Sequence, residues 1–241
     1  MNLNSPFLAY NQDFVLFGGQ HLVVIGLMLL LSVGLSIWGR QKANEKARDL
    51  VNKVLLVSIA FWAWAYVFIL LWLGDFDYKE DLPLVICNLM AVSLPFMMWR
   101  PTARVHGIVY FLIFCGTLQA VITPDLLNGF PNFIFIKYWM VHAGLIVYAV
   151  YVTVAYRFYP TKRQLWQSFL ILQGYVLAMF LVNALLDSNY FYVMHKPRIA
   201  SALDYLGPWP VYLLVCEALV LGLYFLAFLP VMRHSRVKGD N

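Results

Sequence analysis

Residues Phe133–Tyr156 have the sequence FIFIKYWMVHAGLIVYAVYVTVAY, a run of 24 residues whose only charged residue is Lys137. The hydrocarbon core of a bilayer is about 30 Å thick and takes roughly 20 apolar residues to cross as a helix. A backbone in contact with lipid must satisfy its own hydrogen bonds, so a run of this length and composition predicts a transmembrane helix.

Six further apolar runs surround this one, and together they predict an all-α polytopic membrane protein with seven transmembrane helices in a single domain, 1–241. No linker is long enough to separate two domains. The third run is short and contains Pro83 and Pro95; we expect Pro83 in its first turn and a kink or an end near Pro95. In order, the runs are roughly His21–Trp38, Val54–Leu73, Leu82–Met98, Val105–Thr123, Phe133–Tyr156, Leu165–Leu186 and Trp209–Val231.

The composition excludes several other classes. Hydrophobic residues make up 62% of the 241 residues and charged residues 12%, whereas a soluble domain carries about 25% charge. A soluble enzyme, a disordered chain and a nucleic-acid-binding protein are therefore excluded. The net charge of +5 does not indicate a nucleic-acid partner, because the basic residues lie in short loops between apolar runs.

Those loops predict the orientation in the membrane. Of the 17 Lys and Arg residues, 13 lie in alternate connections, and the positive-inside rule assigns these connections to the cytoplasm. The N-terminus is then outside and the C-terminus cytoplasmic. The predicted inner set is Arg40, Lys42, Lys46, Arg48, Lys53, Arg100, Arg104, Arg157, Lys162, Arg163, Arg233, Arg236 and Lys238, and the outer set is Lys79, Lys137, Lys196 and Arg198.

Polar side chains in a membrane are costly and usually face the bundle interior or a water-filled cavity. A rise of about 1.5 Å per residue gives each one a depth. Six spans place a polar residue in the outer half, whereas the inner halves are nearly all apolar. We therefore predict one polar pocket that opens toward the outer leaflet. Its candidates are His21, Cys87, Asn88, Gln119, His142, Asn183, Asp187 and Glu217.

This set contains the groups that a cysteine nucleophile requires. A thiol reacts as the thiolate and needs a base, which a histidine on another helix at similar depth can supply. Cys87 and His142 are the candidates for this pair. Asn88, Gln119 or Asn183 would stabilise a developing oxyanion, and Glu217 or Asp187 would orient the imidazole. Cys115 and Cys216 are interpreted as packing residues. The acidic and histidine residues show no metal-ligand spacing such as H-E-x-x-H, so neither a metal nor a cofactor is predicted.

Four strings resemble the YwaF/TMEM164 family of integral membrane proteins, in order and spacing, over nearly the whole chain. The first begins L-P-L and ends in cysteine, and the second is an aromatic run that ends in histidine. The third is Asn189-Tyr190 followed by Lys196-Pro197, and the fourth leads into Glu217. The first, second and fourth are Leu82–Cys87, Phe135–His142 and Gly207–Tyr212.

The resemblance implies a seven-helix fold and, for the animal members, a phospholipid acyltransferase that moves an acyl chain onto a lysophospholipid. The catalytic cysteine and histidine that it implies correspond to Cys87 and His142. The compact chain is more similar to the bacterial members, which implies a multi-pass protein of the bacterial plasma membrane. The expected partners are the membrane and its phospholipid and lysophospholipid substrates.

Two other functions stay open from the sequence. The first is a transporter or receptor that binds a lipid or a small molecule in the same polar pocket, with Cys87 only packing. The second is a structural membrane protein whose polar residues hold its helices together. In that case the polar side chains should be paired with one another.

Overall fold

The computed structural model describes residues 13–197 and 202–235, and within these residues the regular secondary structure is all helical, with no strand. Seven apolar helices follow one another in the predicted order, which confirms the polytopic fold. Six of them are long and apolar enough to cross a membrane. They are α1 (Gly19–Gln41), α2 (Glu45–Leu73), α4 (Ala103–Ile122), α5 (Phe133–Ala155), α6 (Lys162–Leu186) and α7 (Val211–Phe228), and the shorter one is α3 (Ile86–Met98).

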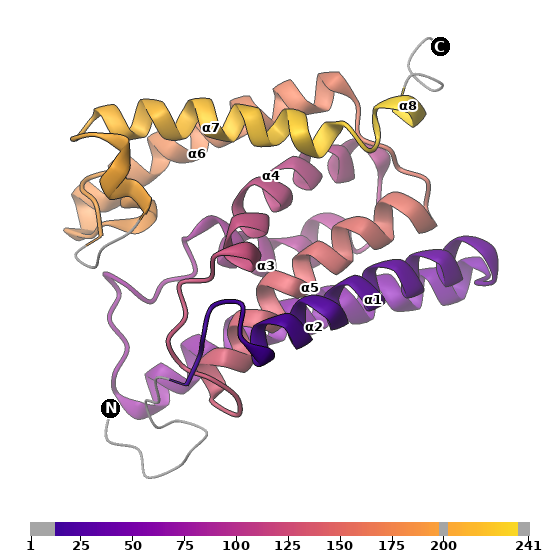
Figure 1. The fold of residues 1–241 in the computed structure, drawn as a ribbon, viewed down its shortest axis with the longest axis horizontal. Helices are drawn as coiled ribbons and strands as arrows, with labels where there is room; N and C mark the ends of the chain where they lie inside the picture. Colours follow the sequence, from indigo (N-terminus) through magenta and orange to yellow (C-terminus); the bar gives the residue numbers. More distant parts are fainter. Residues whose placement is uncertain (1–12, 198–201, 236–241) are drawn as a thin grey trace.

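The helices form three layers, with α4 at the centre (Figure 1). Helices α1, α2 and α5 pack together in one layer, and α6 and α7 form the opposite layer. Helix α4 contacts both layers, because it packs against α5 on one side and against α6 and α7 on the other. Helix α3 lies against α2, α4 and α5. Three short helices complete the described chain: η1 (Tyr190–Tyr192), η2 (Ala202–Leu206) and α8 (Met232–Ser235).

Helix α3 departs from the prediction at its start. The predicted span began at Leu82 with Pro83 in its first turn, but the helix begins at Ile86. Residues 82–85 are irregular, and α3 alone, with 13 residues, is only about 20 Å long. Irregular backbone at membrane depth is tolerated where protein groups satisfy it. Two tyrosine hydroxyls do so here, since Tyr175 donates to the Leu84 carbonyl at 2.7 Å and Tyr190 accepts from the Leu82 N–H at 3.0 Å.

The other end of α3 agrees with the sequence. Pro95 lies inside the helix, which ends three residues later at Met98. Proline lacks an N–H and disfavours a preceding helical residue, so a helix that ends soon after it is the expected outcome.

The basic connections gather at one end of the bundle. Arg40 on α1 donates to the Tyr159 hydroxyl at 3.4 Å, and Arg48 on α2 donates to the Ala155 carbonyl at 3.4 Å. Gln164 at the start of α6 donates to the Ala103 carbonyl at 2.9 Å. By the positive-inside rule this end is cytoplasmic. Three residues of the charge pattern, Arg198, Arg236 and Lys238, lie outside the described residues.

Gly107 on α4 packs closely against the side-chain amide of Gln164. A Cβ atom there would overlap the side-chain amide of Gln164, which is held in place by the capping box with Thr161. We expect Gly107→Ala to lower the free energy of unfolding by about 1–2 kcal/mol, because the helix cap is displaced. Thermal unfolding in detergent measures this. Gly174 on α6 meets no atom within 4 Å, so Gly174→Ala is the control and should not destabilise.

Candidate functional site

Cys87 is the second residue of α3, directly after the irregular segment 82–85. The first amides of a helix have no intrahelical acceptor, and Val85 provides no side-chain cap. The described residues offer no acceptor to the N–H groups of Ile86, Cys87 or Asn88. A thiol in this position lies beside three unused donors and the positive end of the helix dipole, which favour negative charge that develops on the oxygen of a bound ester.

The Cys87 side chain points into the interface between α3 and α4. It is buried, and its Sγ atom lies 3.6 Å from the Thr117 hydroxyl. The approach depends on Gly116, since a Cβ atom there would lie 3.4 Å from Sγ and 3.0 Å from the Ile86 side chain. Thr117 was not a sequence candidate, because a threonine in an apolar helix carries no signal that separates it from packing residues.

His142 on α5 is held by Tyr138, one turn earlier. The two rings are in contact, with centroids 4.1 Å apart and planes tilted by 30°, and His142 Nδ1 lies 2.8 Å from the Tyr138 carbonyl. A carbonyl oxygen only accepts, so the proton lies on Nδ1 and the lone pair lies on Nε2. No described residue hydrogen-bonds to Nε2. A neutral imidazole oriented in this way has its basic nitrogen available.

Cys87 and His142 do not hydrogen-bond to each other in this structure. The helices that carry them are nevertheless adjacent, because α3 packs against α5. The Tyr138 hydroxyl on α5 donates to the Ala120 carbonyl on α4 at 2.8 Å, and Cys87 on α3 contacts Thr117 on α4. Helix α4 therefore contacts both the helix that carries Cys87 and the helix that carries His142. A catalytic pair is often longer than a hydrogen bond before substrate binds.

Two of the predicted supporting residues have structural partners instead. Asn183 is buried, and its side chain bonds to both the N–H and the carbonyl of Tyr190, at 2.7 and 2.9 Å. Glu217 accepts a hydrogen bond from Gln173 at 2.6 Å, which joins α7 to α6. Glu217 thus pairs with Gln173 rather than with His142. For these two side chains, the structure shows the pairing expected if polar residues hold helices together.

The other three predicted residues lie in different surroundings. Asp187 ends α6 with its side chain exposed and forms an ion pair with Lys79 at 2.6 Å, which lowers the pKa of Asp187 and raises that of Lys79. Gln119 is exposed on α4. Asn88 is half-buried, and its Oδ1 atom is buried without a partner among the described residues. Of the five supporting candidates, only Asn88 adjoins Cys87.

The remaining candidate is His21, and both of its ring nitrogens form hydrogen bonds. The side chain is buried, and its Nδ1 accepts a hydrogen bond from the Phe17 N–H at 3.0 Å. The proton of the neutral ring is therefore on Nε2, which donates to the Val121 carbonyl at 2.9 Å. A neutral histidine with both nitrogens engaged ties α1 to α4 and has no nitrogen left for catalysis.

The cytoplasmic half contains more buried polar groups than predicted. Asn52 on α2 donates to the Met98 carbonyl at 3.1 Å, and His106 on α4 lies 2.8 Å from the Thr153 hydroxyl. That hydroxyl donates to the Ala149 carbonyl at 2.7 Å, so it accepts from His106. Asn52 thus links α2 to α3, and His106 links α4 to α5. Depth alone did not separate these residues from interfacial ones.

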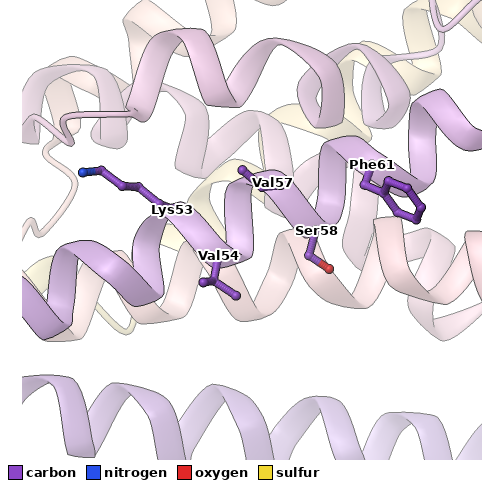
Figure 2. A pocket seen from close by; sticks show the side chains of 5 residues that line it. All are labelled: Lys53, Val54, Val57, Ser58 and Phe61. Atoms are coloured by element: carbon purple, nitrogen blue, oxygen red, sulfur yellow. The ribbon is translucent and has the colours of Figure 1, made fainter.

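An open groove of about 430 Å³ lies along α2, and Cys87 is not among its lining residues (Figure 2). Its lining is mostly apolar, and Lys53 lies at one end with its Nζ atom 5.4 Å from the centre of the Trp99 ring. Figure 2 shows the five side chains along successive turns of one helix. The groove contains none of the predicted site residues. Its lining residues are Lys53, Val54, Val57, Ser58 and Phe61.

The helical architecture, with six helices long and apolar enough to cross a membrane, defines an integral, multi-pass membrane protein that carries Cys87 and His142 on two packed helices. The chain belongs to the TMEM164 family, whose profile matches residues 16–228. No curated protein and no solved structure matches the chain. Family membership thus confirms the resemblance that the four sequence strings carry.

Proposed function

We propose that this protein is a membrane phospholipid acyltransferase in which Cys87 carries the acyl group. The observation that supports this most directly is the position of Cys87. It lies at the start of a short helix, beside the unused N–H groups of Ile86, Cys87 and Asn88. Donors already oriented toward a developing oxyanion are worth more in a water-poor site than in water.

The first half-reaction transfers an acyl group to the protein. His142 Nε2 takes the proton of the Cys87 thiol, and Sγ attacks the acyl ester carbon of a donor phospholipid. The oxyanion is stabilised by the N–H groups at the start of α3. The ester C–O bond then breaks, His142 returns the proton to the leaving oxygen, and a lysophospholipid departs from the Cys87 thioester.

The second half-reaction reverses these roles. The hydroxyl of an acceptor lysophospholipid gives its proton to His142 and attacks the thioester carbon. The C–S bond breaks, a new ester forms, and the proton returns to the Cys87 sulfur. Tyr138 keeps His142 in the required tautomer through its carbonyl oxygen, as second-shell groups commonly do for histidines.

A trapped thioester tests the first half-reaction. Purified protein incubated with a diacyl phospholipid of defined chain length should gain the mass of one acyl group. Neutral hydroxylamine should remove this mass, since it cleaves thioesters faster than oxygen esters. An unchanged intact mass together with unchanged lipids would contradict the proposal.

The contact between Cys87 and Thr117 favours one alternative function. A thiol hydrogen-bonded to a threonine and packed on Gly116 is also what a purely structural cysteine shows. The protein would then bind a lipid or a small molecule without covalent chemistry. Release of intact co-purified lipid, with no acylated protein, would favour this function.

A further inference from the structure

Lys137 is a cation inside a membrane span, on the second turn of α5. It lies four residues after Phe133, about 6 Å along the helix, and its side chain is half-buried. A charged residue at such a depth usually faces the protein interior and has a charged or polar partner. The surroundings of Lys137 show what kind of partner is missing.

The ammonium group of Lys137 contacts an aromatic ring rather than an anion. Its Nζ atom lies 4.5 Å from the centre of the Tyr66 ring, a cation–π contact. The Tyr66 hydroxyl donates to Asp81 Oδ1 at 3.0 Å, and Asp81 Oδ2 accepts from the Asp77 N–H at 2.9 Å. Both carboxylate oxygens of Asp81 therefore accept hydrogen bonds from groups other than Lys137. Among residues 13–197 and 202–235, no carboxylate lies within 4 Å of Lys137.

The same cation lies on a helix that packs against the helix of the proposed nucleophile. Lys137 is on the second turn of α5, Cys87 is the second residue of α3, and these two helices are in contact. A positive charge that has no carboxylate within 4 Å among the described residues thus lies one helix contact away from the start of α3. Lysine binds phosphate as a point charge, and a charge-assisted hydrogen bond is stronger than a neutral one.

We propose that Lys137 binds the phosphate group of the substrate glycerophospholipid and thereby places its acyl ester at Cys87. This inference rests on the proposed acyl transfer. In a glycerophospholipid only the glycerol carbons and two ester oxygens separate the phosphorus atom from the nearer acyl carbonyl. An ammonium on α5 and a thiol on the adjacent α3 are placed to contact these two groups of one lipid molecule. Lys137 is therefore a residue that determines specificity for phosphate-bearing lipids.

A binding experiment tests this without acyl transfer. The Cys87→Ala protein is incubated with phosphatidylethanolamine or with diacylglycerol of the same chains, and the retained lipid is measured by native mass spectrometry. Lys137→Met in this background should lower retention of phosphatidylethanolamine about tenfold and leave diacylglycerol unchanged. Lys137→Arg should retain phosphatidylethanolamine. Equal retention by the Met variant would overturn the inference.

Lys53→Met is the matched control, because Lys53 also contacts an aromatic ring but lies at the cytoplasmic end. The Lys53→Met substitution should change the retention of neither phosphatidylethanolamine nor diacylglycerol. Inorganic phosphate added as a competitor should not release the phospholipid. Its release by phosphate would show a site for a free anion and would contradict the lipid assignment.

Acylation rates separate this role from a direct effect on the thiol. Lys137→Met in the otherwise unchanged protein should slow thioester formation from phosphatidylethanolamine about tenfold more than from diacylglycerol. An equal loss with both donors would mean that Lys137 stabilises the thiolate, and would overturn the inference. If no donor acylates the wild-type protein but binding depends on Lys137, the acyl-transfer proposal fails and the phosphate site stands.

Discussion

Replacing Cys87 by alanine is expected to lower acyl transfer by about 10⁴-fold or more, because the alanine side chain has no atom that can form the thioester. The intact mass of the variant should stay unchanged after incubation with phospholipid. Folding should be little affected, since the substitution removes one sulfur atom from a site packed on Gly116 and Thr117. Production of labelled diacyl phospholipid from a labelled lyso-acceptor measures the transfer.

The chain provides two matched controls for this prediction. Cys115 on α4 is buried like Cys87, and Cys216 on α7 is half-buried. Neither lies at a helix N-terminus with unused N–H groups. Cys115→Ala and Cys216→Ala should both retain transfer and acylation. Loss of acylation in either control, with Cys87→Ala still acylated, would assign the nucleophile to a different helix.

The loss of acyl-transfer rate caused by substituting His142 should not add to the loss caused by substituting Cys87. His142→Ala alone should slow transfer about 10²–10⁴-fold, which is the range for a general base. The double variant Cys87→Ala/His142→Ala should be no slower than Cys87→Ala, because residues that act as one unit give strongly non-additive effects. A further fall in the double variant would mean that His142 acts on another step.

Depth along a helix could be predicted from the sequence, and rotation about the helix axis could not. The apolar runs and loop charges indicated each helix and the end at which it starts, and Cys87 and His142 lie on two of these helices, α3 and α5, which pack together. Rotation needs a polar face to compare with an apolar one, and a helix that is apolar all round has none. The rotation that exposes Gln119 on α4 and turns Glu217 toward Gln173 therefore could not be predicted.

The start of α3 was mispredicted for a related reason. Hydropathy does not separate a helical apolar residue from an irregular one, and Leu82 and Leu84 are as apolar as the helix that follows. The irregular form depends on hydroxyl groups that are distant in sequence, those of Tyr175 and Tyr190. Lys137 was interpreted only as a charge in an outer loop. The better signal was its position five residues before His142, within the same apolar run.

Asn183→Leu is expected to lower the free energy of unfolding by about 2–5 kcal/mol. The asparagine satisfies the N–H and the carbonyl of Tyr190 and also accepts from the Ser188 hydroxyl at 2.8 Å. A leucine of similar size would leave the two Tyr190 groups without partners, at a cost of about 1–3 kcal/mol for each buried group. The unfolding midpoint in detergent measures the loss.

The same substitution should also slow acylation at a distance from the nucleophile. Tyr190 holds the backbone before α3 through its hydroxyl, which donates to the Tyr78 carbonyl at 2.7 Å and accepts from Leu82. Loosening Tyr190 therefore loosens the segment that leads to Cys87. Ser188→Ala removes only one bond to Asn183 and is the control, with a cost of about 1 kcal/mol or less. An Asn183→Leu protein as stable as wild type would show that the outer loop does not depend on this side chain.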